Sequence, residues 1–174
     1  PCSSQKFKSK SDRSWPVENF ISVIKYLSET KNIQVIVSGG KSEIEVYYSK
    51  MLNLETFNNN VINLIGNSTL REMASLIKKA DFVISPDSGP AHVATIMDTP
   101  IIGLYALTNP QRSGPFKSLN LTVDKYKESL KKYENKTLDQ VKWDFKLKHP
   151  SAMALITPEE LISNIERLLV VLKD

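Results

Sequence analysis

The sequence has little of the chemistry that cross-links or anchors a small protein. Cys2 is the only cysteine, which excludes an internal disulfide. The sequence has only two histidines besides, and no cluster has the spacing of a zinc site. No apolar run is long enough to span a bilayer, and no positively charged leader with an apolar core begins the chain. Because the chain begins with Pro1 rather than Met, we expect it to be a piece of a larger soluble protein.

Composition and charge limit the function further. The 174 residues are 41% hydrophobic and 24% charged, enough to bury one core, and we expect a single domain over 1–174. The net charge is +4, with lysines concentrated in 6–13 and 125–148. Such a balance suits anionic partners, although a charge run is more often only a solvated face. No nucleic-acid recognition module accompanies these lysines, so we expect no nucleic-acid partner.

Short apolar segments alternate with amphipathic ones along the chain. The apolar segments predict strands at 33–37, 61–65, 82–84, 100–105 and 121–123. Helices are predicted after Trp15-Pro16, at 43–52, after Ser68 or Thr69, after Asp87, and at about 158–172. Residues 1–14 read as a loop that leaves an earlier strand, whereas 106–118 is turn-like and 124–149 irregular. The alternation predicts an α/β fold with a parallel sheet covered on both sides.

One strand–turn–helix unit carries the candidate site. Asp87 and Ser88 are favourable N-cap residues after a buried strand, and Pro90 suits the first helical turn. Free amides at such a turn bind anions, so we expect a phosphate cradle at the N–H groups of Ser88, Gly89 and Ala91. Asp87 beside it can accept hydrogen bonds from hydroxyls. The alternative is a well-capped helix start without a ligand.

Two neighbouring residues have open interpretations. His92 either braces the turn through a backbone hydrogen bond or faces a ligand. Glu43 follows the strand at 33–37 and would lie at the same carboxyl edge of the sheet. It could bind ribose hydroxyls, or it could simply be a helix-start acid favoured by the helix dipole.

Stronger motifs are absent. Pro86 stands where a hydrolase nucleophile elbow around Ser88 needs a small residue. Gly39-Gly40 has the glycine spacing of neither a Walker loop nor the Rossmann fingerprint.

With these residues in place, the chain resembles the C-terminal domain of glycosyltransferase family 9, the lipopolysaccharide heptosyltransferases. Asp87-Ser88-Gly89-Pro90-Ala91-His92 with its flanking strands carries the most specific part of the resemblance. The remaining segments are Pro1-Cys2-Ser3-Ser4 followed by a basic residue, Trp15-Pro16, Gly39-Gly40 with Glu43, Leu64-Ile65-Gly66, Thr108 to Pro115, and Pro150-Ser151-Ala152-Met153. The last two resemble the branch that acts on the inner core.

The resemblance implies a GT-B enzyme with two Rossmann-like, doubly wound domains. This chain would be the nucleotide-sugar-binding half, and the N-terminal acceptor domain would be missing. The donor would be ADP-heptose and the acceptor the lipopolysaccharide inner core, at the cytoplasmic face of the inner membrane with peripheral contact to anionic lipid. No metal or other cofactor is implied.

The resemblance also assigns roles to residues. Ser88 and Gly89 would bind the donor diphosphate through their amides, Asp87 would contact the sugar or its phosphate, and Glu43 would bind the adenosine ribose. Ser3 or Ser4 and a cation, Arg13 or its rival Lys10, would also meet the diphosphate. The catalytic base is expected in the missing domain, so the fragment should bind ADP weakly and transfer nothing. The alternatives are a GT-B transferase with another nucleotide sugar and a binding module without turnover.

Overall fold

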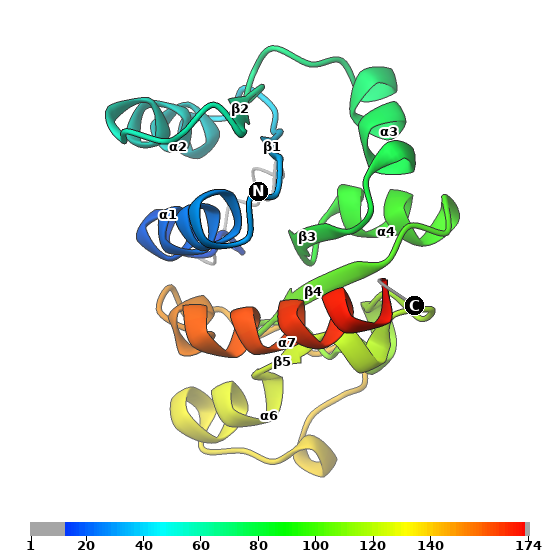
Figure 1. Ribbon diagram of the computed structural model, residues 1–174. Coiled ribbons are helices and arrows are strands. Elements are labelled where there is room, and N and C mark those ends of the chain that lie inside the picture. The colour runs from blue at the N-terminus through cyan, green and yellow to red at the C-terminus, as the bar shows by residue number, and fades with distance from the viewer. Residues whose placement is uncertain (1–12, 173–174) are drawn as a thin grey trace.

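The computed structural model describes residues 13–172, which form short parallel strands surrounded by helices (Figure 1). The helices are α1 (Val17–Lys25), α2 (Glu43–Leu54), α3 (Leu70–Lys79), α4 (Gly89–Ile96), α5 (Pro110–Ser113), α6 (Tyr126–Ser129) and α7 (Pro158–Val171). The strands are β1 (Val35–Val37), β2 (Val61–Asn63), β3 (Val83–Pro86), β4 (Ile101–Tyr105) and β5 (Val123–Asp124). Wider π-helical turns extend α1 through Tyr26–Thr30 and α6 through Leu130–Glu134. Three 3-10 turns lie at Leu119–Leu121, Leu138–Gln140 and Met153–Leu155.

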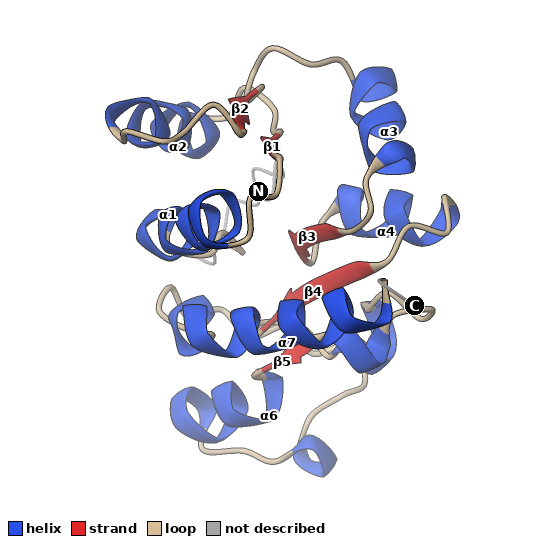
Figure 2. Cartoon of the chain, viewed as in Figure 1, coloured by secondary structure: helices blue, strands red, loops and turns tan. Residues whose placement is uncertain are grey.

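All strand pairs are parallel, as the alternating pattern predicts. β1 pairs with β2, with Val35 opposite Val61, and β4 lies between β3 and β5. Within residues 13–172 these are two separate sheets, visible as two groups of strands in Figure 2. β1 and β3 are therefore not hydrogen-bonded to each other. The earlier strand, which residues 1–14 were predicted to leave as a loop, lies outside the described residues.

Helices cover both faces of the β3-β4-β5 sheet. Ile102 and Leu104 of β4 pack into the core that holds α7, whereas Ile101 packs against Ile77 of α3 and Ala94 of α4. All five residues of β4 are buried. A strand buried on both faces needs apolar residues at consecutive positions rather than alternate ones, which explains the continuous run of apolar side chains there.

Capping side chains fix where the longer helices begin. Ser42, Thr69 and Thr157 each accept the backbone N–H three residues later, and Glu45, Glu72 and Glu160 bond back to them. Such capping boxes satisfy N–H groups that would otherwise lack partners. Of the two caps predicted for α3, Thr69 is the one used. The predicted C-terminal helix is confirmed, with its start at Pro158.

The segment 124–149 is more ordered than the sequence pattern predicts. It contains the end of β5, α6 with its π-helical extension, and a 3-10 turn. Tyr126, Leu130 and Leu147 are at most 1% exposed, and the Leu147 amide donates to the Leu107 carbonyl at 2.9 Å. Because these buried apolar residues are widely spaced and lie among lysines, the sequence pattern of the segment is irregular. The strand predicted at 121–123 is likewise shifted to Val123–Asp124.

Candidate functional site

The turn between β3 and α4 has the predicted shape. Ser88 has extended backbone angles at the N-cap position, Gly89 begins α4, and Pro90 lies in its first turn (Figure 1). The Ser88 side chain does not cap the helix. Its Oγ lies 2.9 Å from Ser85 Oγ, and Ser85 Oγ donates to the Pro86 carbonyl at 3.0 Å. Because a hydroxyl has one proton, Ser88 must be the donor toward Ser85, so only its amide can donate to an anion.

Two of the three predicted amides are available. The N–H groups of Ser88 and Gly89 donate to nothing within residues 13–172. The space beside Gly89 is open, since a Cβ added there would meet no atom within 4 Å. Ala91 is the exception: its amide donates to the Ser88 carbonyl at 3.1 Å, closing the first turn of α4, so it is removed from the predicted cradle.

Asp87 is buried and firmly held. The Thr108 hydroxyl donates to its Oδ2 at 2.8 Å, and Arg13 Nη1 donates to the same oxygen at 3.2 Å and to the Asp87 carbonyl at 2.9 Å. The side chains of Arg13 and Asp87 are only 19% and 10% exposed, so the ion pair is largely shielded from solvent. Asp87 Oδ1 accepts no hydrogen bond from the described residues. One carboxylate oxygen is therefore fixed by the protein, and the other can accept from a ligand.

The basic residue at this turn is Arg13. Its guanidinium reaches Asp87 across 74 positions of sequence. Lys10, Ser3 and Ser4 lie outside the described residues, and their roles stay predictions. Sequence reasoning missed Thr108, whose one signal is a hydroxyl placed just past the carboxyl end of the buried strand β4.

Tyr105, at the end of β4, lies within the electrostatic reach of this ion pair. Its hydroxyl donates to the Ser113 carbonyl at 3.1 Å. Burial raises the pKa of Tyr105 well above its ordinary value; the negative charge of Asp87 adds to this effect and Arg13 opposes it. The phenol therefore keeps its proton well above neutral pH, and its hydrogen bond ties α5 to β4.

The loops after β1 and β2 meet at the carboxyl edge of the β1-β2 sheet. Ser38 Oγ and Ser68 Oγ are 3.1 Å apart, and Gly66, at φ +76°, donates its amide to Gly39 O at 3.0 Å. Glycine adopts such a positive φ without steric cost. The two loops therefore form one hydrogen-bonded rim.

Glu43 is exposed at the first position of α2 and makes no hydrogen bond with the described residues. The buried carboxylate of this rim is Glu45, 2% exposed, which accepts from the amides of Gly40 at 2.7 Å and Ser42 at 3.1 Å. The Ser42-x-x-Glu45 spacing was the signal that could have found it. Glu45 holds the glycine turn, and Glu43 is left facing solvent.

His92 is exposed on α4. It makes no hydrogen bond to the part of the chain that the structure describes, so the bracing bond weighed for it is not observed there.

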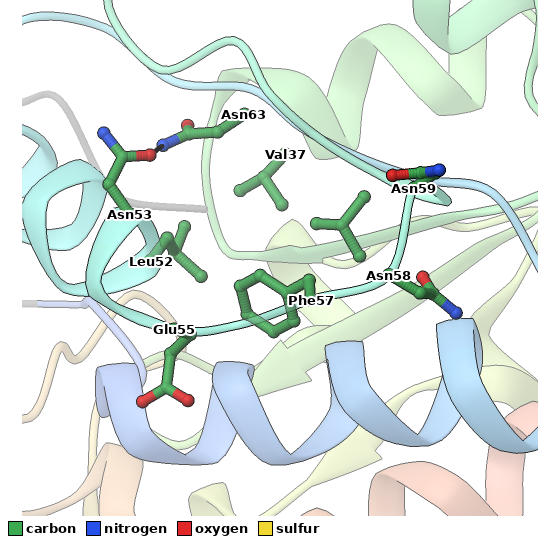
Figure 3. Close-up of a pocket in the computed structure, with 9 residues that line it drawn as sticks. Val37, Leu52, Asn53, Glu55, Phe57, Asn58, Asn59 and Asn63 are labelled. Atoms are coloured by element: carbon green, nitrogen blue, oxygen red, sulfur yellow. Dashed lines mark hydrogen bonds between the residues drawn. The ribbon is translucent and has the colours of Figure 1, made fainter.

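A pocket of about 450 Å³ lies elsewhere, between the end of α2, the loop 55–60 and the β1-β2 sheet (Figure 3). Val37, Leu52, Phe57 and Val61 supply its apolar lining, and Glu55 with four asparagines supplies polar groups. Two of these asparagines are hydrogen-bonded to each other, since Asn63 Nδ2 donates to Asn53 Oδ1 at 2.9 Å. None of the predicted site residues lines this pocket, so it is separate from the turn at Asp87.

Residues 13–172 lack two further features. No group of three or more His, Cys, Asp or Glu side chains there could hold a metal ion. No helix in the same range is long and apolar enough to cross a membrane.

Known proteins resemble the chain over nearly its whole length. It is 37% identical to the lipopolysaccharide core heptosyltransferase OpsX of Haemophilus influenzae, across 97% of this chain and 46% of that protein. It is 25% identical to lipooligosaccharide heptosyltransferase 2 of Campylobacter jejuni, across 91% of this chain and 48% of that protein. The chain thus spans about half the length of these curated relatives.

Solved structures share the fold. A family 9 glycosyltransferase from Veillonella parvula superposes with a TM-score of 0.66 at 24% identity, covering 97% of this chain and 44% of that one. Escherichia coli ADP-heptose LPS heptosyltransferase II gives 0.68 at 17% identity, covering 96% and 45%. E. coli heptosyltransferase WaaC with ADP gives 0.64 at 20% identity, covering 96% and 42%. These likenesses establish the GT-B type of α/β fold.

The sequence model of glycosyltransferase family 9 (heptosyltransferase) matches residues 1–143. Together with the identity to OpsX across 97% of the chain, this match shows that the chain belongs to glycosyltransferase family 9, the heptosyltransferases.

Proposed function

We propose that this chain is the donor-binding domain of an inverting heptosyltransferase, which moves heptose from ADP-heptose to the lipopolysaccharide inner core. The observation that carries the proposal is the turn after β3, where the amides of Ser88 and Gly89, which donate to no described residue, lie next to the Arg13–Asp87 ion pair. Amides at a helix start and a guanidinium are the donors that a diphosphate requires.

In the proposed reaction, this domain stabilises the departing diphosphate. As the glycosidic bond to the diphosphate breaks, negative charge grows on the phosphate oxygens. The Ser88 and Gly89 amides and Arg13 stabilise that charge without reorganising. Asp87 Oδ1 accepts a hydrogen bond from a hydroxyl group of the sugar, and the Glu43 carboxylate accepts one from the ribose. Inversion also requires a base to deprotonate the acceptor hydroxyl, and we assign that base to an N-terminal domain of the same enzyme.

The names of two structural relatives agree with an adenine nucleotide donor. One is described as an ADP-heptose LPS heptosyltransferase and another as a heptosyltransferase with ADP. For this chain we propose ADP-heptose as the donor. We also propose that the enzyme acts at the cytoplasmic face of an anionic membrane. The basic segment 125–148, in which Trp143 is 63% exposed, supports peripheral contact with such a surface.

Calorimetry with ADP tests the proposal. The chain alone should bind ADP weakly and the full-length enzyme more tightly. Arg13→Gln and Asp87→Ala should each weaken binding of the donor by about 10-fold or more, since hydrogen bonds to charged groups contribute about 1.5–3 kcal/mol. Arg71→Gln, on the exposed surface of α3, is the matched control and should bind as the parent does.

The outcome that rejects the donor assignment is a chain that binds no ADP, together with a full-length enzyme whose binding ignores Asp87→Ala. Titration with UDP and GDP in parallel separates an ADP-sugar enzyme from a GT-B transferase with another donor. Binding without any transfer by the full-length enzyme favours a non-catalytic module.

A further inference from the structure

Three chain segments meet at one oxygen atom, Asp87 Oδ2. Thr108 comes from the loop after β4, Arg13 precedes α1, and Asp87 follows β3. The Thr108 hydroxyl donates to Oδ2 at 2.8 Å, which is shorter than the 3.2 Å contact from Arg13 Nη1. Thr108 is 3% exposed, so water does not compete for this bond.

The carboxylate has two equivalent oxygens, and its terminal torsion is broad. Arg13 alone could hold either oxygen, because a guanidinium pairs with both in the same way. A second donor to the same oxygen restricts rotation of the carboxylate about that torsion, so that the other oxygen keeps one direction. We infer that Thr108 is a positioning residue of the donor site: its hydroxyl fixes the Asp87 carboxylate so that Oδ2 holds Arg13 and Oδ1 remains open to a ligand hydroxyl.

The loop does not need this hydroxyl for its own fold. The Leu107 carbonyl is bonded to the Leu147 amide at 2.9 Å, and Asn109 Oδ1 caps the following helix α5 by accepting from Gln111 N at 3.0 Å. Ala106 and Leu107, which follow the end of β4, are both buried. The polar contact of Thr108 therefore serves Asp87, not the loop.

The ligand part of this inference rests on the proposed function, whereas the effect on Arg13 does not. The experiment compares Thr108→Val, which keeps the shape and loses the hydroxyl, with Thr108→Ser, which keeps the hydroxyl. NMR of the Arg13 guanidinium in the unliganded chain gives the first readout. The second is the affinity for an ADP-sugar and for ADP, measured by NMR titration.

In Thr108→Val we expect faster proton exchange and broader signals for the Arg13 guanidinium. ADP-sugar affinity should fall about 10-fold and ADP affinity less, because the Oδ1 contact is to the sugar. Thr108→Ser should restore both readouts. In an Asp87→Ala background, Thr108→Val should change nothing further, since its effect passes through the carboxylate.

The inference is overturned if the Arg13 signals of Thr108→Val match those of the parent, or if Thr108→Ser fails as Thr108→Val does. An additive effect in the Asp87→Ala background overturns it as well. If Arg13 responds as expected while even the parent binds no ADP-sugar, the donor assignment fails and the positioning role stands. Thr108→Ala, which also lacks the hydroxyl, replaces Thr108→Val should the valine variant not fold.

Discussion

Single side chains around Asp87 are held by partners far away in sequence. Thr108 is 21 residues from Asp87, and Arg13 is 74 residues away. Removing one member of such a buried ion pair leaves the other uncompensated, which costs far more than the pair contributes net to the fold. A substitution at Arg13, Asp87 or Thr108 can therefore disturb the geometry of this site even when the surrounding side chains stay well packed.

Tyr105 provides a pH test at this scale. Its folded pKa is raised above the ordinary value of 10.0, so the folded protein keeps the phenolic proton when the unfolded chain releases it. The stability contributed by the neutral phenol is complete below about pH 10 and declines as the pH rises further. Urea denaturation of the parent should show this decline.

Tyr105→Phe should cost about 1 kcal/mol at neutral pH, for the bond to Ser113, and should show a shallower decline above pH 10. Parallel pH profiles for parent and variant would contradict the assignment of the shift to Tyr105.

The parts of this site that the sequence could predict are those whose contacts join residues close together in the sequence. Ser88, Gly89 and Pro90 were predicted because caps and helix starts depend on neighbouring residues. The role of Thr108 could not be, because it depends on two loops brought together by the parallel pairing of β3 and β4. Glu45 was predictable from its capping-box spacing, but Glu43 was proposed as the ligand instead.

At the scale of elements, β4 shows how tightly the centre of the molecule is packed. A Cβ added to Gly103 would lie 2.6 Å from Cε2 of Tyr105, whose side chain is 1% exposed. Either the buried ring or the strand would have to shift to accept the added methyl group. We expect Gly103→Ala to destabilise the fold by about 1–3 kcal/mol.

The matched control is Gly89→Ala, because the added methyl group would meet no atom within 4 Å. Thermal unfolding of the two variants should separate them by several degrees. Equal melting temperatures would show that the Tyr105 ring moves aside without cost.

The elements themselves were largely predictable, with errors at their boundaries. α2 runs two residues past the predicted end at 52, and β2 ends at Asn63 rather than 65. α6 was missed because Tyr126 is its only buried apolar residue, and it is followed by the exposed, charged Lys127 and Glu128. Helices without a cap or a full apolar stripe give little local signal, and only tertiary packing forms them.

At the scale of the whole molecule, the two ends of the described chain share one core. The Trp15 indole donates to the Ile156 carbonyl at 2.9 Å, and Leu161, Ile165 and Leu168 of α7 join the same cluster of buried side chains as Trp15. α1 and α7 lie side by side in Figure 1. The C-terminal helix thus closes the core that the N-terminal segment begins.

Leu161→Ala should therefore destabilise the entire chain by about 2–5 kcal/mol, because Leu161 is fully buried. Leu172→Ala is the control: the same atoms are removed from the end of the same helix, at a side chain that is 42% exposed. The midpoint of urea denaturation should fall strongly for the first variant and hardly for the second. Similar midpoints would show that α7 is not part of the cooperative core.

Strand pairing also sets the order in which the molecule opens. Within residues 13–172, β4 has a partner strand on both sides, whereas β1 and β3 are paired on one side only. Backbone amides open to solvent with free energies that follow such local support. The unit formed by β1, α2 and β2 should therefore exchange its amide protons well before β4. Local opening of this kind would begin at the loops beside Glu43, while β4, the strand that leads to Thr108, stays closed.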